Sequence, residues 1–217
     1  MTVEQKLSFN FEARYFKNGN LENAKEVWFV IHGYGQLAKY FIRKFSVVEQ
    51  ANICIIAPEG LSHFYLEDIA TRTAGGSNRV GATWMTRENR EGDIQNYITY
   101  LNTLYTKEIG SRKIKTTLLG FSQGSATVTR WALDGKVNFD RLVLWAGIFP
   151  PDMDFKKGHE MLAKKEVIEV LGKNDPYITQ EKKKELNRLS EALQITPKLI
   201  EFDGGHDIDA ITLKSLI

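Results

Sequence analysis

The sequence predicts an α/β fold in which a mostly parallel central sheet carries helices on both faces, with an antiparallel edge strand near the N-terminus. Short runs that are apolar throughout, such as residues 27–31 and 53–57, are typical of strands buried on both sides of a parallel sheet. Amphipathic segments of helical length lie between these runs, and alternation of strands with helices favours parallel pairing. We expect residues 1–217 to form a single domain without a large cap.

The strands can be assigned in chain order. Apolar and polar residues alternate from Leu7 to Tyr15, a period of two that predicts a strand with one face in water. This alternation favours the antiparallel edge position. Further buried strands are expected at residues 116–121, 142–145, 167–171 and 199–202.

Helical patterns occupy the intervals between the strands. In the clearest one Ile94, Tyr97 and Leu101 recur on one side, as in a helix that packs on a sheet. The expected helices cover about residues 37–50, 91–107, 122–133 and 180–193, with a short piece from residue 208.

Composition excludes several classes of protein. The formal net charge is +2, which gives no general electrostatic case for binding nucleic acid. No apolar stretch has the length of a membrane span, and the first residues lack the apolar core of a signal peptide. The one cysteine, Cys54, lies in an apolar strand and favours a buried structural thiol. We therefore expect a cytoplasmic protein without integral membrane association.

The most informative motif is Gly120-Phe121-Ser122-Gln123-Gly124, which follows an apolar strand and precedes a helix. In the pattern G-x-S-x-G, a serine sits on a tight strand-to-helix turn with its hydroxyl exposed, and the glycines allow close approach of the backbone. An ordinary glycine turn with a serine cap is the alternative reading of the pentapeptide.

A serine hydroxyl needs a neutral imidazole to accept its proton and a carboxylate to orient that imidazole. Asp175 follows the strand that ends near residue 171, and His206 follows the last strand in a loop with two glycines. Each has an ordinary reading, as an Asp-Pro turn and as a surface histidine. Because Ser122, Asp175 and His206 occur in the chain order of this type of site, we expect them to form a triad.

Attack on an ester carbonyl builds negative charge on oxygen, which two preset backbone N–H groups can stabilise. The residue after the nucleophile, Gln123, supplies the first expected donor. A glycine-rich loop, residues 32–36, follows the strand that ends at Ile31, and the N–H of Tyr34 is the second expected donor. A glycine-rich connection with no ligand is the alternative. No cofactor or metal is expected, because Asp203, Asp207 and Asp209 have no second histidine or cysteine nearby in the sequence.

With these motifs in view, the chain resembles an α/β-hydrolase, and more narrowly the phospholipase/carboxylesterase group that includes acyl-protein thioesterases. The resemblance covers almost the whole chain, and its matching pieces are His32-Gly33-Tyr34-Gly35, Ala57-Pro58-Glu59-Gly60, Gly120-Phe121-Ser122-Gln123-Gly124, Asp175-Pro176 and Gly204-Gly205-His206. It implies an α/β-hydrolase fold in which Ser122 is the nucleophile, His206 the general base and acid, and Asp175 its orienting carboxylate. It also implies that Tyr34 and Gln123 donate the oxyanion hydrogen bonds.

Two stretches depart from the pattern of that group. Gln36 stands where an aspartate is common, and Met85-Thr86-Arg87 follows Trp84 where an aromatic residue and an aspartate are frequent. Trp84 and Phe149 are candidates for an apolar substrate-binding wall, with packed side chains as the alternative. Arg79, Arg87 and Arg90 flank Trp84, either as solvated side chains or as partners of a carboxylate on the substrate.

The leading functional prediction is a serine hydrolase that cleaves small-molecule carboxylic esters or thioesters through an acyl-enzyme on Ser122. A serine peptidase or a C–C bond hydrolase with the same triad is the first alternative. A non-catalytic binding domain of the same fold is the second, although a binding domain has no need of all three groups. The sequence leaves a homodimer possible and gives no sign of a nucleic-acid partner.

Overall fold

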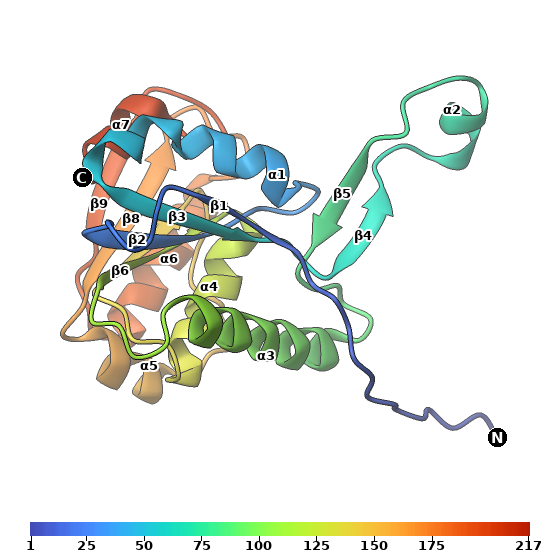
Figure 1. Ribbon diagram of the computed structural model, residues 1–217, viewed down its shortest axis with the longest axis horizontal. Helices are drawn as coiled ribbons and strands as arrows, with labels where there is room; N and C mark the ends of the chain where they lie inside the picture. The colour runs from blue at the N-terminus through green and yellow to red at the C-terminus, as the bar shows by residue number, and fades with distance from the viewer.

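A computed structural model describes residues 1–48 and 51–217 of the chain in full, and its centre is a seven-stranded sheet (Figure 1). The order of the strands is β1-β3-β2-β6-β7-β8-β9, and every neighbouring pair except β1 and β3 is parallel. The expected mostly parallel sheet is therefore confirmed. The bounds are β1 Tyr15–Asn18, β2 Glu26–Ile31, β3 Ile53–Pro58, β6 Lys115–Phe121, β7 Arg141–Trp145, β8 Glu166–Gly172 and β9 Lys198–Phe202.

The antiparallel edge strand is present, but it begins where the sequence predicted that it would end. Tyr15 pairs with Pro58, the last residue of β3, and the pairing continues to Asn18 opposite Ile55. Residues before Tyr15 therefore have no β3 residue opposite them. The alternating segment from Leu7 to Arg14 lies outside any strand, and the first residues extend away from the body of the molecule (Figure 1).

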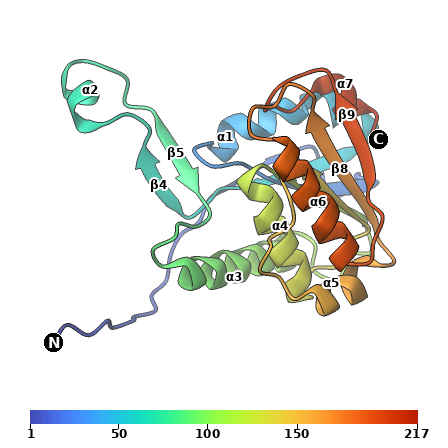
Figure 2. The ribbon, with the colours of Figure 1, turned by 180° about the vertical axis from the view of Figure 1, so that it is seen from behind.

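Helices cover both faces of the sheet, as expected (Figure 2). One face carries α1 and the 3₁₀ helix η1 together with α7, and the other carries α3, α4, α5 and α6. No helix among the described residues is both long enough and apolar enough to cross a bilayer. The bounds are α1 Ala38–Phe41, η1 Ile42–Ala51, α3 Arg90–Glu108, α4 Gln123–Asp134, α5 Phe155–Leu162, α6 Gln180–Ala192 and α7 Ala210–Lys214.

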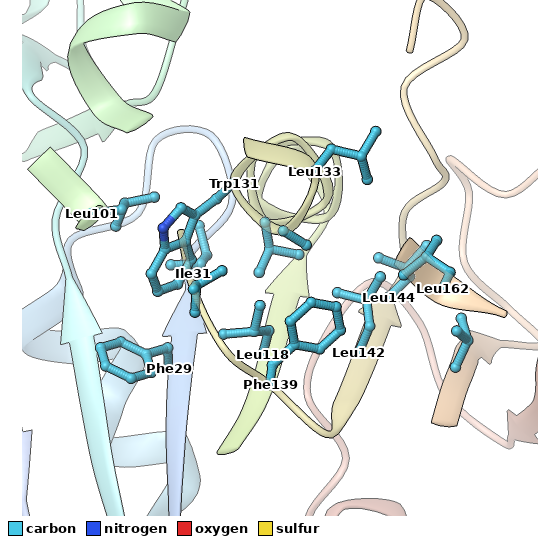
Figure 3. Close-up of a cluster of buried hydrophobic side chains, with 14 of the residues drawn as sticks. Phe29, Ile31, Leu101, Leu118, Trp131, Leu133, Phe139, Leu142, Leu144 and Leu162 are labelled. Atoms are coloured by element: carbon cyan, nitrogen blue, oxygen red, sulfur yellow. The ribbon is translucent and has the colours of Figure 1, made fainter. Parts of the chain in front are cut away.

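Side-chain alternation along each strand divides the core into two clusters. In β2, Phe29 and Ile31 point to the face of α3 and α4, whereas Trp28 and Val30 point to the face of η1. Figure 3 shows the first cluster, in which Trp131 of α4 lies over the strands beside Phe29. The rings of Phe29 and Trp131 meet edge to face, with centroids 5.3 Å apart. This contact packs α4 against the sheet.

A short arm interrupts the alternation between β3 and α3 and was not predicted from the sequence. It consists of the antiparallel strands β4 (Ser62–Tyr65) and β5 (Val80–Thr83), with the helix α2 (Ile69–Thr73) at its tip. The arm stands away from the central sheet (Figures 1 and 2). It meets the rest of the chain through a bridge between Gln36 and Ala82 and through the ring of Phe64, which packs against Tyr34 with centroids 5.0 Å apart.

Candidate active site

Ser122 lies on the turn between β6 and α4 in an unusual backbone conformation. Its φ is +54° and its ψ is −116°, in a region that costs a residue with a side chain about 1–3 kcal/mol. The main-chain N–H of Ser122 donates to the carbonyl of Trp145 at 2.8 Å, and its carbonyl accepts from Ser125 at 3.0 Å. The turn is thus held from β7 and from α4, which offsets the local strain.

The glycines of this turn are required by contact with other backbone atoms. A Cβ atom on Gly120 would collide with the carbonyl of Gly124, and one on Gly124 would collide with the carbonyl of Ile31 in β2. Helix α4 can start close to the ends of β2 and β6 only because both positions lack a side chain. The geometry is that of a strand-turn-helix elbow with a partly exposed serine.

Asp175 and His206 come together from the loops that follow β8 and β9. The Nδ1 atom of His206 lies 2.6 Å from Oδ2 of Asp175. The other carboxylate oxygen accepts from the main-chain N–H of Tyr177 at 2.9 Å. The two loops are also joined directly, because the N–H of Asn174 donates to the carbonyl of Gly204 at 2.9 Å. Asp175 is 6% exposed, so its pairing with the imidazole is shielded from water.

The His206 ring lies beside the elbow. It packs against Phe121, the residue before Ser122, with ring centroids 4.9 Å apart, and against Tyr177 at 4.7 Å. In the part of the chain that the structure describes, no hydrogen bond joins the Ser122 hydroxyl to this ring. Catalytic hydrogen bonds are often long in ligand-free structures and shorten when the substrate binds. The three side chains thus come from three neighbouring loops at the carboxyl ends of β6, β8 and β9.

The glycine-rich loop after β2 passes next to the elbow. A Cβ atom on Gly33 would lie 3.2 Å from Cβ of Ser122, so the loop backbone comes as close to the serine as a glycine allows. The main-chain N–H groups of Tyr34 and Gln123 have no hydrogen-bond partner within the described residues. Gln123 is the first residue of α4, where the helix itself leaves N–H groups unpaired. Both expected donors are therefore free to bind an oxygen atom.

His32 anchors this loop, and its ring is not available as a general acid or base. Its Nδ1–H donates to the carbonyl of Gly33 at 2.7 Å, and its Nε2 accepts from the N–H of Gly60 at 2.9 Å. Burial lowers the pKa of His32 to about 4, because the charged ring would lose its hydration. A neutral, doubly hydrogen-bonded ring therefore ties the end of β2 to the end of β3.

The two residues suggested as an apolar substrate wall are core residues in the structure. Trp84 is 2% exposed, its indole N–H donates to the carbonyl of His32 at 2.9 Å, and its ring packs against His32 and Tyr97. Phe149 is fully buried in the cluster of the α4 face. The alternative interpretation, in which both side chains pack in the core, accounts for Trp84 and Phe149, because neither side chain reaches the surface where a ligand could touch it.

The arginines that flank Trp84 do not form a common site. Arg79 pairs with Glu67 in the arm at 2.6 Å. Arg90, at the start of α3, pairs with Glu91 and Asp152. Arg87 lies at the surface between these two pairs in the sequence. Two of the three guanidinium groups thus have carboxylate partners within the protein.

Two polar side chains near the site had no role in the sequence analysis. The Gln123 amide bonds the main chain of Trp84 and Met85, and the Thr83 hydroxyl lies 3.0 Å from its nitrogen. The sequence held no signal for these contacts, because they depend on the arm. Only the pairing of β4 with β5 brings Thr83 next to the elbow.

Comparisons with known proteins agree with this arrangement. A family model described as "Serine hydrolase (FSH1)" matches residues 23–210. A search of curated protein sequences finds no match. Similar solved structures include the esterase PE8 (TM-score 0.68, 18% identity, covering 95% of this chain and 96% of that one) and a carboxylesterase of Bacillus cereus (0.67, 18%, 95% and 92%). Another is acyl-protein thioesterase 2 of Zea mays (0.67, 16%, 94% and 98%).

At these identities the solved structures establish the fold, which is that of the α/β-hydrolases. The family match extends over most of the chain and includes the segments that hold Ser122, Asp175 and His206. The chain therefore belongs to the FSH1 family of serine hydrolases.

Proposed function

We propose that this protein hydrolyses carboxylic esters or thioesters through an acyl-enzyme on Ser122, with His206 as general base and acid and Asp175 as its orienting carboxylate. The observation that carries the proposal is the 2.6 Å contact between His206 and the buried Asp175, beside the elbow that holds the serine. A carboxylate bound to Nδ1 keeps the proton on that nitrogen and leaves Nε2 free to accept one.

The proposed acylation step uses these groups as follows. The Ser122 oxygen attacks the carbonyl carbon while its proton moves to Nε2 of His206, and the carbonyl oxygen becomes an oxyanion. The N–H groups of Tyr34 and Gln123, which have no partner among the described residues, bind that oxyanion. Collapse of the intermediate expels the alcohol or thiol, which takes the proton from Nε2.

Deacylation repeats the same steps with water. His206 takes a proton from the attacking water molecule, and the new oxyanion occupies the same two donors. When this second intermediate collapses, the Ser122 oxygen leaves with a proton from Nε2, and the carboxylic acid is released. The enzyme returns to its initial protonation state.

The names of the similar structures support esters and thioesters as the substrate class, since they include a carboxylesterase and an acyl-protein thioesterase. Both leaving groups use the same acyl-enzyme, so relative rates decide between them. A panel of p-nitrophenyl esters and matching thioesters of increasing acyl length measures this preference.

The direct test is labelling by a fluorophosphonate probe together with turnover of that panel. We expect the wild type to be labelled once and to hydrolyse short esters, and Ser122→Ala to do neither. Ser77→Ala is the matched control, because Ser77 lies in the exposed tip of the arm. The proposal fails if the wild type neither labels nor exceeds Ser122→Ala on any member of the panel.

A further inference from the structure

Trp84 contacts both of the segments that supply the proposed oxyanion donors. Its indole N–H donates to the carbonyl of His32 at 2.9 Å, at the start of the loop that holds Tyr34. Its main-chain N–H donates to Oε1 of Gln123 at 3.2 Å. One buried residue thus joins the loop after β2 to the first residue of α4.

Both the oxygen and the nitrogen of the Gln123 side-chain amide form hydrogen bonds to the main chain at Trp84 and Met85. Oε1 accepts from the N–H of Trp84, and Nε2 donates to the carbonyl of Met85 at 3.1 Å. The N–H of Trp84 and the carbonyl of Met85 face the same side chain, and the amide of Gln123 satisfies both. The Thr83 hydroxyl lies within 3.1 Å of this amide and donates to the carbonyl of Met85 at 3.0 Å.

The strand that leads into Trp84 also binds the loop directly. The N–H of Gly35 donates to the carbonyl of Ala82 at 2.9 Å, and the N–H of Ala82 donates to the carbonyl of Gln36 at 3.2 Å. A Cβ atom on Gly81 would lie 2.5 Å from the carbonyl oxygen of Gly35, so the two backbones touch. The base of the arm therefore fixes the loop on one side and α4 on the other.

We propose that Trp84 and the side chain of Gln123 are positioning residues that set the distance between the N–H groups of Tyr34 and Gln123. This inference rests on the proposed function, because it assigns a structural cause to that oxyanion hole. The donors belong to segments 89 residues apart in the sequence, and an oxyanion hole works only when both donors are in place before the charge develops. Trp84 acts through its neighbours, since it is 2% exposed.

The test compares two buried tryptophans that each use their indole N–H. Trp84→Phe keeps an aromatic ring and removes the bond to His32. Trp131→Phe is the matched control, because Trp131 is fully buried in the core and its indole N–H donates to Asn102 at 2.9 Å. Both variants lose the hydrogen bond of an indole N–H and a similar ring area, but of the two tryptophans it is Trp84 that bonds the loop after β2.

We expect Trp84→Phe to lower kcat for a p-nitrophenyl ester about tenfold and to change KM less than twofold, because a misplaced donor weakens transition-state binding alone. Gln123→Glu, which sets a carboxylate oxygen against the carbonyl of Met85, should act in the same direction. Trp131→Phe should leave kcat within about twofold of the wild type. Equal kcat values for Trp84→Phe and Trp131→Phe would overturn the inference, as would an effect of Trp84→Phe on KM alone.

Hydrogen exchange provides a readout that does not require turnover. The amides of Gly35 and Ala82 should exchange faster in Trp84→Phe than in the wild type and should be unchanged in Trp131→Phe. Unchanged exchange in Trp84→Phe would contradict the positioning role even in an active enzyme. If the wild type has no esterase activity but exchange responds as expected, the proposed function fails and the connection between the segments stands.

Discussion

The carboxylate of Asp175 is held on both sides, with His206 Nδ1 at 2.6 Å from one oxygen and the Tyr177 N–H at 2.9 Å from the other. Asp175 follows β8 and His206 follows β9, so the register of two adjacent parallel strands sets this contact. The imidazole is thereby fixed in one tautomer, with Nδ1–H directed at the carboxylate.

Asp175→Asn tests that arrangement. The amide can donate to the ring and favours the wrong tautomer, so we expect kcat for ester hydrolysis to fall by about 10³–10⁴-fold with little change in KM. Steady-state kinetics on a p-nitrophenyl ester provides the measurement. Asp203→Asn, an exposed position in the same pair of loops, is the control and should stay close to wild type. Retention of more than about a tenth of kcat in Asp175→Asn would exclude the orienting role.

Gly124→Ala should destabilise the fold, because the added methyl group collides with the carbonyl of Ile31. Forcing apart packed backbones costs about 1–3 kcal/mol in free energy of unfolding. Urea denaturation followed by fluorescence measures the change. Gly205→Ala is the matched control beside the same site, since its Cβ would find only the carbonyl of Asn174, at 3.8 Å. Equal stability of the two variants would mean that the elbow relaxes freely.

Arg141 and Glu26 form a buried ion pair at the opposite end of the sheet, 2.9 Å apart, with side chains 6% and 11% exposed. Arg141→Met leaves the Glu26 carboxylate with the half-exposed Lys115, 3.0 Å away, as its cationic partner, and we expect a loss of about 3 kcal/mol in free energy of unfolding. The double variant Glu26→Gln/Arg141→Met should recover most of that loss, because no buried charge remains. A double variant as unstable as Arg141→Met would show that lost packing of the Arg141 side chain, and not the charge left on Glu26, causes the destabilisation. Urea denaturation of the three proteins decides this.

Glu169 lies in β8, 3% exposed, with the Ser190 hydroxyl 3.2 Å from its carboxyl group. Burial raises the pKa of Glu169 from 4.5 to about 7. The folded state therefore binds this proton more tightly than the unfolded state does. Between about pH 4.5 and pH 7 this group reduces the stability of the fold as the pH rises.

Glu169→Gln removes that dependence. Relative to wild type, the variant should gain up to about 3 kcal/mol in free energy of unfolding between pH 5 and pH 8, since one pKa unit corresponds to about 1.4 kcal/mol. Urea denaturation at several pH values measures the difference between the two proteins. A difference that does not change with pH would show that the carboxyl group titrates normally.

Much of the fold followed from sequence pattern alone. Uniformly apolar runs such as residues 53–57 predicted parallel strands, because a strand buried on both faces has no polar side. The same reasoning failed for Leu7 to Arg14. Alternation indicates a strand but does not supply a pairing partner, and β3, the strand that pairs with β1, ends at Pro58 opposite Tyr15. This reasoning also missed the arm and helix α5, whose segments are short.

Ser122, Asp175 and His206 could be proposed as a triad from the sequence, because turn glycines and strand ends leave local signals. Their spatial relationship was not, since the contact of His206 with Asp175 depends on the register of β8 and β9. The contacts of Trp84 were likewise decided by tertiary structure. An indole in a loop looks the same in sequence whether it lines a pocket or bonds a distant carbonyl, and only packing brings His32 and Gln123 to its two N–H groups.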